Sequence, residues 1–160
     1  MEALIIIDVQ NGLVRKDLYN KELFIATVNK AIEVNRKNNN LIIFVQHNSK
    51  LLENGTNNWE ICTRLNQSEK DIVIQKQHGD AFKKTNLKNI LNENNISTIT
   101  ICGLVSHGCV LYSCKGGIKS GFSVKLIKNG HTNWSNEAEK KIIDVENELQ
   151  NLGVTILNLK

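Results

Sequence analysis

The chain has 160 residues, a formal net charge of +4, 41% hydrophobic residues and 22% charged residues, which is ordinary for a globular domain large enough to bury a core. Its lysines are scattered and form no basic stripe, so nucleic acid is not expected as a partner. The N-terminal apolar run is too short to span a bilayer and lacks the basic start of an export signal. We therefore expect a single domain over residues 1–160, located in the cytoplasm and without a membrane partner.

Short β-branched apolar runs alternate with segments of helical periodicity along the whole chain. The first half predicts a strand at 3–8, a helix at 21–38 capped by Asn20, a strand at 41–47, a long polar segment at 48–70 with a short helix near 56–65, and a strand at 71–76. The second half predicts a helix at 86–94, a strand at 97–103, a helix at 106–120, a strand at 122–128, a helix that is capped by Ser135 and runs to 151, and a strand at 154–157. The alternation indicates a Rossmann-like three-layer α/β/α sandwich with a mostly parallel sheet of six strands.

Ligands of such sheets bind beyond the carboxyl ends of the strands, so reactive side chains are expected where strands end. Asp8 ends the first predicted strand, Lys76 ends the third, and Cys109 lies at the start of the helix after the fourth. Each also has an ordinary interpretation. Asp8 is then a turn residue, Lys76 a solvated strand end and Cys109 a small buried hydrophobic residue.

Taken together, these three side chains suit nucleophilic catalysis by a thiol. Cys109 would attack a carbonyl carbon after losing its proton to Asp8, and the Lys76 ammonium would orient the carboxylate. A helix N-terminus is expected to lower the pKa of the Cys109 thiol. Backbone N–H groups at the same helix start are suited to holding an oxyanion.

Three segments of the sequence are similar to the signatures of isochorismatase-like cysteine hydrolases, in the same order: ALIIIDVQNG at 3–12, VIQKQHGDAF at 73–82 and CGLVSHGCV at 102–110. The stretch VKLIKNGHTNW at 124–134 also resembles the family's segment after the fifth strand. The resemblance implies Asp8 as general base, Lys76 as its partner and Cys109 as nucleophile. It also implies a cis peptide between Val105 and Ser106, with the backbone of Val105, Ser106 and Cys109 forming the oxyanion hole.

The sequence departs from the family pattern at two positions. Asn129 stands where members commonly have an acid, and Leu111 stands near a position that is often polar. Nicotinamidase-like relatives bind a metal through Asp and His residues after the second strand, whereas this chain has only His47 there. Because a metal site normally needs three or more protein ligands, we expect no metal and no cofactor, and activity that survives a chelator.

Four further side chains are candidates for lining a substrate pocket, namely Gln10, His47, Trp59 and His107. His131 is interpreted as a turn residue. The segment at 48–70 has little sequence of its own to bury Trp59, Ile61 and Leu65, which predicts a homodimer or a higher oligomer.

The sequence therefore predicts a hydrolase that cleaves an amide-type C–N bond of a small molecule through a Cys109 thioester. The resemblance includes enzymes that act on nicotinamide, carbamoylated amines, ureido compounds and the cyclic amides of streptothricin. Two alternatives stay open. One is hydrolysis of a vinyl ether, as in isochorismate hydrolases, and the other is a binding protein that retains the fold without catalysis.

Overall fold

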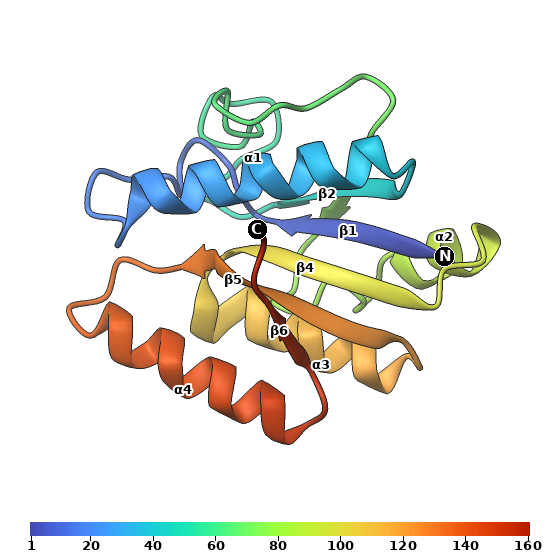
Figure 1. Ribbon diagram of the computed structural model, residues 1–160. Helices are drawn as coiled ribbons and strands as arrows, with labels where there is room; N and C mark the ends of the chain where they lie inside the picture. The colour runs from blue at the N-terminus through green and yellow to red at the C-terminus, as the bar shows by residue number, and fades with distance from the viewer.

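A computed structural model describes residues 1–160 and shows one sheet of six strands in the order β3-β2-β1-β4-β5-β6 (Figure 1). The strands are β1 (Glu2–Ile7), β2 (Leu41–His47), β3 (Ile72–Lys76), β4 (Thr98–Leu104), β5 (Ser123–Thr132) and β6 (Thr155–Leu157). Every neighbouring pair is parallel. The predicted class and sheet are confirmed, and the predicted mostly parallel sheet is wholly parallel.

Helices cover both faces of the sheet (Figure 1). The helix α1 (Lys21–Lys37) packs on one face, and α2 (Leu87–Glu93), α3 (Leu111–Lys119) and α4 (Ala138–Asn151) pack on the other. A wide π-type turn, η1 (Ser106–Val110), precedes α3. None of these helices combines the length and apolar character that crossing a bilayer requires.

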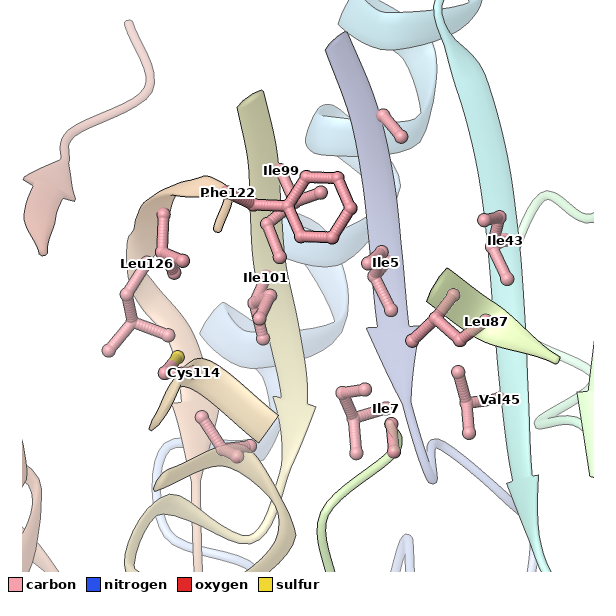
Figure 2. Packing of buried hydrophobic residues seen from close by; sticks show 14 of the residues in the cluster. Ile5, Ile7, Ile43, Val45, Leu87, Ile99, Ile101, Cys114, Phe122 and Leu126 are labelled. Carbon is pink, nitrogen blue, oxygen red and sulfur yellow. The ribbon is translucent and has the colours of Figure 1, made fainter. Parts of the chain in front are cut away.

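The central strand β1 is buried on both faces, which explains its unbroken apolar run. Because side chains alternate along a strand, Ala3, Ile5 and Ile7 join one apolar cluster, and Leu4 and Ile6 join the other. Figure 2 shows the first cluster, in which Ile5 and Ile7 lie between side chains of β2 and β4. Residues from α2, α3 and α4 complete this cluster, and residues from α1 complete the second.

Two predicted helix starts differ in detail. Asn20 precedes α1 as expected, but its backbone is left-handed (φ 49°) and its side chain makes no capping bond. The last helix begins at Ala138, and its N-cap residue is Glu137 and not the predicted Ser135. The Ser135 hydroxyl accepts a hydrogen bond from the Glu137 N–H (3.1 Å), so Ser135 closes the turn that leads into the helix.

The segment at 48–70 forms turns, and the short helix predicted near 56–65 is absent. Its apolar side chains turn inward, because Leu65 is buried in the cluster on the α1 side and Ile61 packs against that cluster. The expectation that Leu65 and Ile61 are left exposed is therefore wrong. Trp59, the third side chain in that expectation, is partly exposed. The homodimer or higher oligomer stays a prediction. Its support is weaker than the sequence suggested, because two of the three side chains on which it rested pack inside the domain.

The strand order reverses between β1 and β4, because the chain builds β1, β2 and β3 outward on one side and returns to place β4 beside β1. At such a point the connections leave in opposite directions and open a crevice at the carboxyl ends. Gly103 allows the two strands to meet closely there. A Cβ atom on Gly103 would lie 2.1 Å from the Ile7 carbonyl oxygen, and its φ of +134° disfavours any side chain.

We expect Gly103→Ala to lower the free energy of unfolding by about 3 kcal/mol, because the new methyl group meets backbone that cannot yield without parting β1 from β4. The matched control is Gly153→Ala, which also has a positive φ (+94°) but open space around the new Cβ. That change should cost about 1 kcal/mol, from backbone conformation alone. Urea denaturation of both variants measures the difference, and equal losses would contradict the close approach.

Candidate active site

Asp8 immediately follows β1 at the crevice. Its backbone is left-handed (φ 55°), a conformation that Asp tolerates better than most residues. Its N–H donates to the Val45 carbonyl (2.9 Å), which ties the turn to β2. The Asp8 side chain is almost fully buried (2% exposed). The strand end therefore delivers a carboxylate that water barely reaches.

Lys76 ends β3, opposite His47 at the end of β2. Its side chain is 0% exposed, and its Nζ lies 3.0 Å from Asp8 Oδ2. The same Nζ lies 2.9 Å from the His78 carbonyl oxygen, 2.8 Å from His47 Nδ1 and 3.2 Å from Cys109 Sγ. The ammonium thus joins the predicted base to the predicted nucleophile, and the structure brings Asp8, Lys76 and Cys109 together as the sequence predicts.

His47 is fixed in place by Gln10. The Gln10 side chain accepts from the His47 N–H (2.9 Å) and donates to the His47 carbonyl (3.0 Å). Since the Lys76 ammonium can only donate, His47 Nδ1 must accept, which places the ring proton on Nε2. Burial and the Lys76 charge lower the pKa of His47, so the ring stays neutral. His47 Nε2–H has no partner within the chain and is not among the buried unpaired atoms, so it is free to donate to a ligand.

Cys109 lies in the turn η1 and is partly exposed, unlike the other three cysteines, which are buried. The turn is closed by the Val105 carbonyl, which accepts from the N–H groups of Gly108 (3.0 Å) and Val110 (3.3 Å). Those two N–H groups are therefore already used. The oxyanion role of the Val105, Ser106 and Cys109 backbone stays a prediction.

The predicted site of the cis peptide is wrong by one residue. The cis bond joins Leu104 and Val105, and not Val105 and Ser106. Leu104 is the last residue of β4 and still pairs with Thr132 of β5.

The expected lowering of the Cys109 pKa is also wrong. Burial, reinforced by the negative charge of Asp8, raises the pKa of Cys109 to about 11, and the Lys76 ammonium offsets this only in part. Burial likewise raises the pKa of Asp8 above its ordinary value of 3.8, against the opposing charge of Lys76. The helix-terminus argument fails because Cys109 sits in a wide turn between strand and helix. At rest the site holds a neutral thiol near the buried carboxyl group of Asp8.

Ligand atoms of Asp8, His47 and Cys109 lie within 4.8 Å of one another, a grouping that could hold a metal ion. Lys76 Nζ, however, contacts all three side chains. A divalent cation would have to displace a buried ammonium or sit against it, and like charges at such distances repel strongly. These residues do not fit a metal, because the lysine already supplies the positive charge.

The other predicted pocket residues are placed differently. The Gln10 side chain is hydrogen-bonded to backbone groups, including the Trp59 carbonyl (2.8 Å), so Gln10 positions its neighbours and is not left free to bind a substrate. The Trp59 ring donates to Gln75 Oε1 (3.1 Å) beside the β3 end. His107 is exposed as a residue, and the partial burial of its ring lowers its pKa, with a smaller contribution from the charge of Lys141 in α4. A cavity of about 280 Å³ opens beside Lys76, lined by Gln75, Lys76, Gln77, His78 and Lys84.

His131 is not the turn residue that the sequence suggests. It lies within β5, is 1% exposed, and forms hydrogen bonds on both sides of its ring. Its Nδ1 lies 2.8 Å from Ser106 Oγ, and its Nε2 lies 3.0 Å from Glu146 Oε1. No sequence signal pointed to Glu146, since an acid on an amphipathic helix normally faces water.

The chain is similar to known proteins over nearly its whole length. Residues 2–156 match the family model of the isochorismatase domain. An uncharacterized isochorismatase family protein of Bacillus subtilis is 24% identical over 152 residues, which covers 90% of this chain and 84% of that protein. The crystal structure of an isochorismatase family protein superposes with a TM-score of 0.92 at 28% identity, covering 98% of this chain and 97% of that one. An N-carbamoylsarcosine amidase of Arthrobacter is 33% identical over 63 residues, 39% of this chain and 24% of the amidase.

Removing the ammonium alone should be costly. We expect Lys76→Met to lower the free energy of unfolding at pH 7 by about 3–5 kcal/mol, because it leaves the Asp8 carboxylate buried without its partner. The double variant Asp8→Asn/Lys76→Met should recover much of this loss, since no unpaired charge then remains. Chemical denaturation of both variants is the measurement. A double variant less stable than Lys76→Met would contradict the pairing.

Proposed function

The chain belongs to the isochorismatase family of hydrolases, and on the geometry of its site we propose that it hydrolyses an amide-type C–N bond of a small molecule through a thioester on Cys109. The observation that carries this proposal is the state of Asp8. Its Oδ2 is paired with Lys76, whereas its Oδ1 is buried and has no hydrogen-bond partner. Unpaired buried carboxylate oxygens are costly, so this one is expected to serve as a proton acceptor.

In the first step the Cys109 thiol gives its proton to Asp8 as the sulfur attacks the carbonyl carbon. An S–C bond forms, and the carbonyl π electrons move to oxygen. The raised pKa of Cys109 means that proton transfer and attack belong together, because a free thiolate is scarce at neutral pH. The Lys76 ammonium contacts both Asp8 and Cys109. It therefore stabilises the negative charge on the carboxylate before the transfer and on the sulfur during it.

In the second step the tetrahedral intermediate collapses and the C–N bond breaks. The leaving nitrogen takes the proton that Asp8 holds and departs as a neutral amine or ammonia. Water then attacks the thioester and passes a proton to Asp8. The S–C bond breaks, the carboxylic acid leaves and the sulfur recovers its proton, which restores the starting state.

The surroundings of the site support a small, polar acyl group. The free His47 Nε2–H is a neutral donor on a ring that contacts Lys76, and it is suited to a carbonyl or ring nitrogen of the substrate. Backbone N–H groups at the start of η1 are the proposed oxyanion donors. Two points favour an amide over a vinyl ether as the substrate. One is the similarity to an amidase that acts on an N-carbamoyl compound. The other is Cys109 itself, because vinyl ether cleavage needs no nucleophilic sulfur.

The test is ammonia release from a panel of nicotinamide, pyrazinamide and N-carbamoylsarcosine, with mass spectrometry for an acyl group on Cys109. We expect Cys109→Ser to keep the fold and lose turnover almost completely, since a hydroxyl is far harder to deprotonate than a thiol. Asp8→Asn should lower kcat by about 10²–10⁴-fold, the usual contribution of a general base.

Cys62→Ala is the matched control, because Cys62 is a buried thiol in the opposite apolar cluster. It should leave kcat within about twofold if its packing contribution does not reach the site. Full turnover by Cys109→Ser would point to chemistry without the sulfur. Absence of both turnover and acylation in the unaltered protein would favour a binding role instead.

The dependence of kcat/KM on pH provides an independent check. Asp8 accepts a proton only when ionised, and burial raises its pKa above 3.8. Activity should therefore be present above this raised pKa and fall as the pH drops through it. An acid limb centred at or below 3.8 would contradict the proposed base, as would unchanged activity to pH 4 in a protein still folded by circular dichroism.

A further inference from the structure

A second group of buried polar side chains begins at Ser106, in the same turn as Cys109, and these side chains take no part in the steps above. Ser106 Oγ, the His131 ring and the Glu146 carboxylate form a continuous chain, with distances of 2.8 Å and 3.0 Å at its two links. Ser106 is 0% exposed and His131 is 1% exposed. No substrate can reach this serine, so the three residues cannot act as a separate nucleophilic triad.

The hydrogen-bonded series of Ser106, His131 and Glu146 joins three elements that are distant in sequence. Ser106 is the first residue of η1, His131 comes from β5 and Glu146 comes from α4. A bulge in β5 makes the link possible. The pairing of β5 with β4 jumps from Leu126 opposite Ile101 to His131 opposite Gly103, so the extra β5 residues bring His131 level with the end of β4.

Asn129 lies within this bulge and has a left-handed backbone (φ 64°), a conformation that Asn adopts more readily than most residues. The departure from the family's acid at this position is therefore consistent with the local backbone.

Every side-chain donor in the series Ser106–His131–Glu146 has an acceptor. With a neutral ring, Nε2–H donates to Glu146 and Nδ1 accepts from the Ser106 hydroxyl. The interaction with His131 lowers the pKa of Glu146, with a weaker contribution from Lys128 at 3.6 Å. Buried polar chains that are fully paired fix a single geometry, and they are costly to leave half paired.

We infer that the hydrogen-bonded series Ser106–His131–Glu146 is a positioning device: it fixes the first residue of η1, and with it the proposed oxyanion-binding N–H groups there, relative to the Cys109 sulfur later in the same turn. This inference rests on the proposed function. The residues act through the backbone of η1 and touch neither substrate nor sulfur. A displacement of about 1 Å at such a site lowers the rate roughly 10²-fold. A hydrogen bond that fixes the first residue of η1 is therefore expected to affect the rate of acyl transfer.

Two reagents separate this role from a merely structural one. Iodoacetamide alkylates Cys109 at a saturated carbon, so the sulfur displaces iodide and no oxyanion forms. With 4-nitrophenyl acetate the sulfur attacks a carbonyl, an oxyanion forms, and 4-nitrophenolate leaves as the acetyl thioester appears. The ratio of the acetylation rate to the alkylation rate therefore reports the oxyanion site alone, at a fixed state of the thiol.

The principal variant is Ser106→Ala, which removes only the hydroxyl. We expect the ratio to fall about 10- to 100-fold, with the alkylation rate and its pH profile unchanged. The matched control is Thr132→Val, which removes the neighbouring buried hydroxyl on β5 that donates to the Tyr19 carbonyl (2.6 Å). It should lose comparable stability and leave the ratio within about twofold.

A second pair of variants tests the far end of the chain and serves if Ser106→Ala does not fold. Glu146→Ala should lower the ratio in the same direction, and Glu146→Gln should restore it, because the amide oxygen still accepts from His131 Nε2–H. The double variant Ser106→Ala/Glu146→Ala should lower the ratio no further than the larger single effect, since both changes break one chain.

An unchanged ratio in folded Ser106→Ala or Glu146→Ala would overturn the inference. So would a fall in alkylation that matches the fall in acetylation, because the effect would then lie in the thiol. Failure of the proposed function looks different: in the unaltered protein, Cys109 would show no burst of 4-nitrophenolate while still reacting with iodoacetamide.

Discussion

The buried ammonium of Lys76 is the constraint on which the site depends. A lysine that is 0% exposed must satisfy its charge and its N–H groups within the protein, and here Asp8, His47, Cys109 and the His78 carbonyl provide the partners. Removing a charge from water costs several kcal/mol unless such partners are held in place. The strand ends hold them, and the same contacts set the ionisation of the carboxylate, the tautomer of the histidine and the field at the sulfur.

The all-parallel sheet makes this convergence possible. Parallel strands end at one edge, so three strands can contribute Asp8, His47 and Lys76 to a space a few ångströms wide. Gln10 then clamps both backbone groups of His47, which binds the ends of β1 and β2 to each other. The rigidity of the sheet is therefore transmitted to the polar side chains that follow it.

The strands, their parallel arrangement and the grouping of Asp8, Lys76 and Cys109 at strand ends could be predicted, because apolar runs and element alternation are local signals. The errors lie where distant contacts override local preference. Leu65 reads as an unpartnered loop residue, but it is buried beneath α1. The pKa of Cys109 follows from burial and from Asp8, which local sequence does not reveal. His131 resembles a turn residue because its partners, Ser106 and Glu146, are distant in sequence.

The raised pKa of Cys109 bears on the arrangement of Lys76 and Asp8 near the sulfur. A preformed thiolate would attack without help but would be exposed to oxidation and alkylation whenever the site is empty. In the proposed mechanism a neutral thiol avoids this exposure and loses its proton at the moment of attack, which requires Asp8 Oδ1 to be free, as it is here. Precision in the donor arrangement replaces reactivity of the resting nucleophile. A turn held from the β1–β3 side by Lys76 and from the β5–α4 side by His131 is a structure suited to that demand.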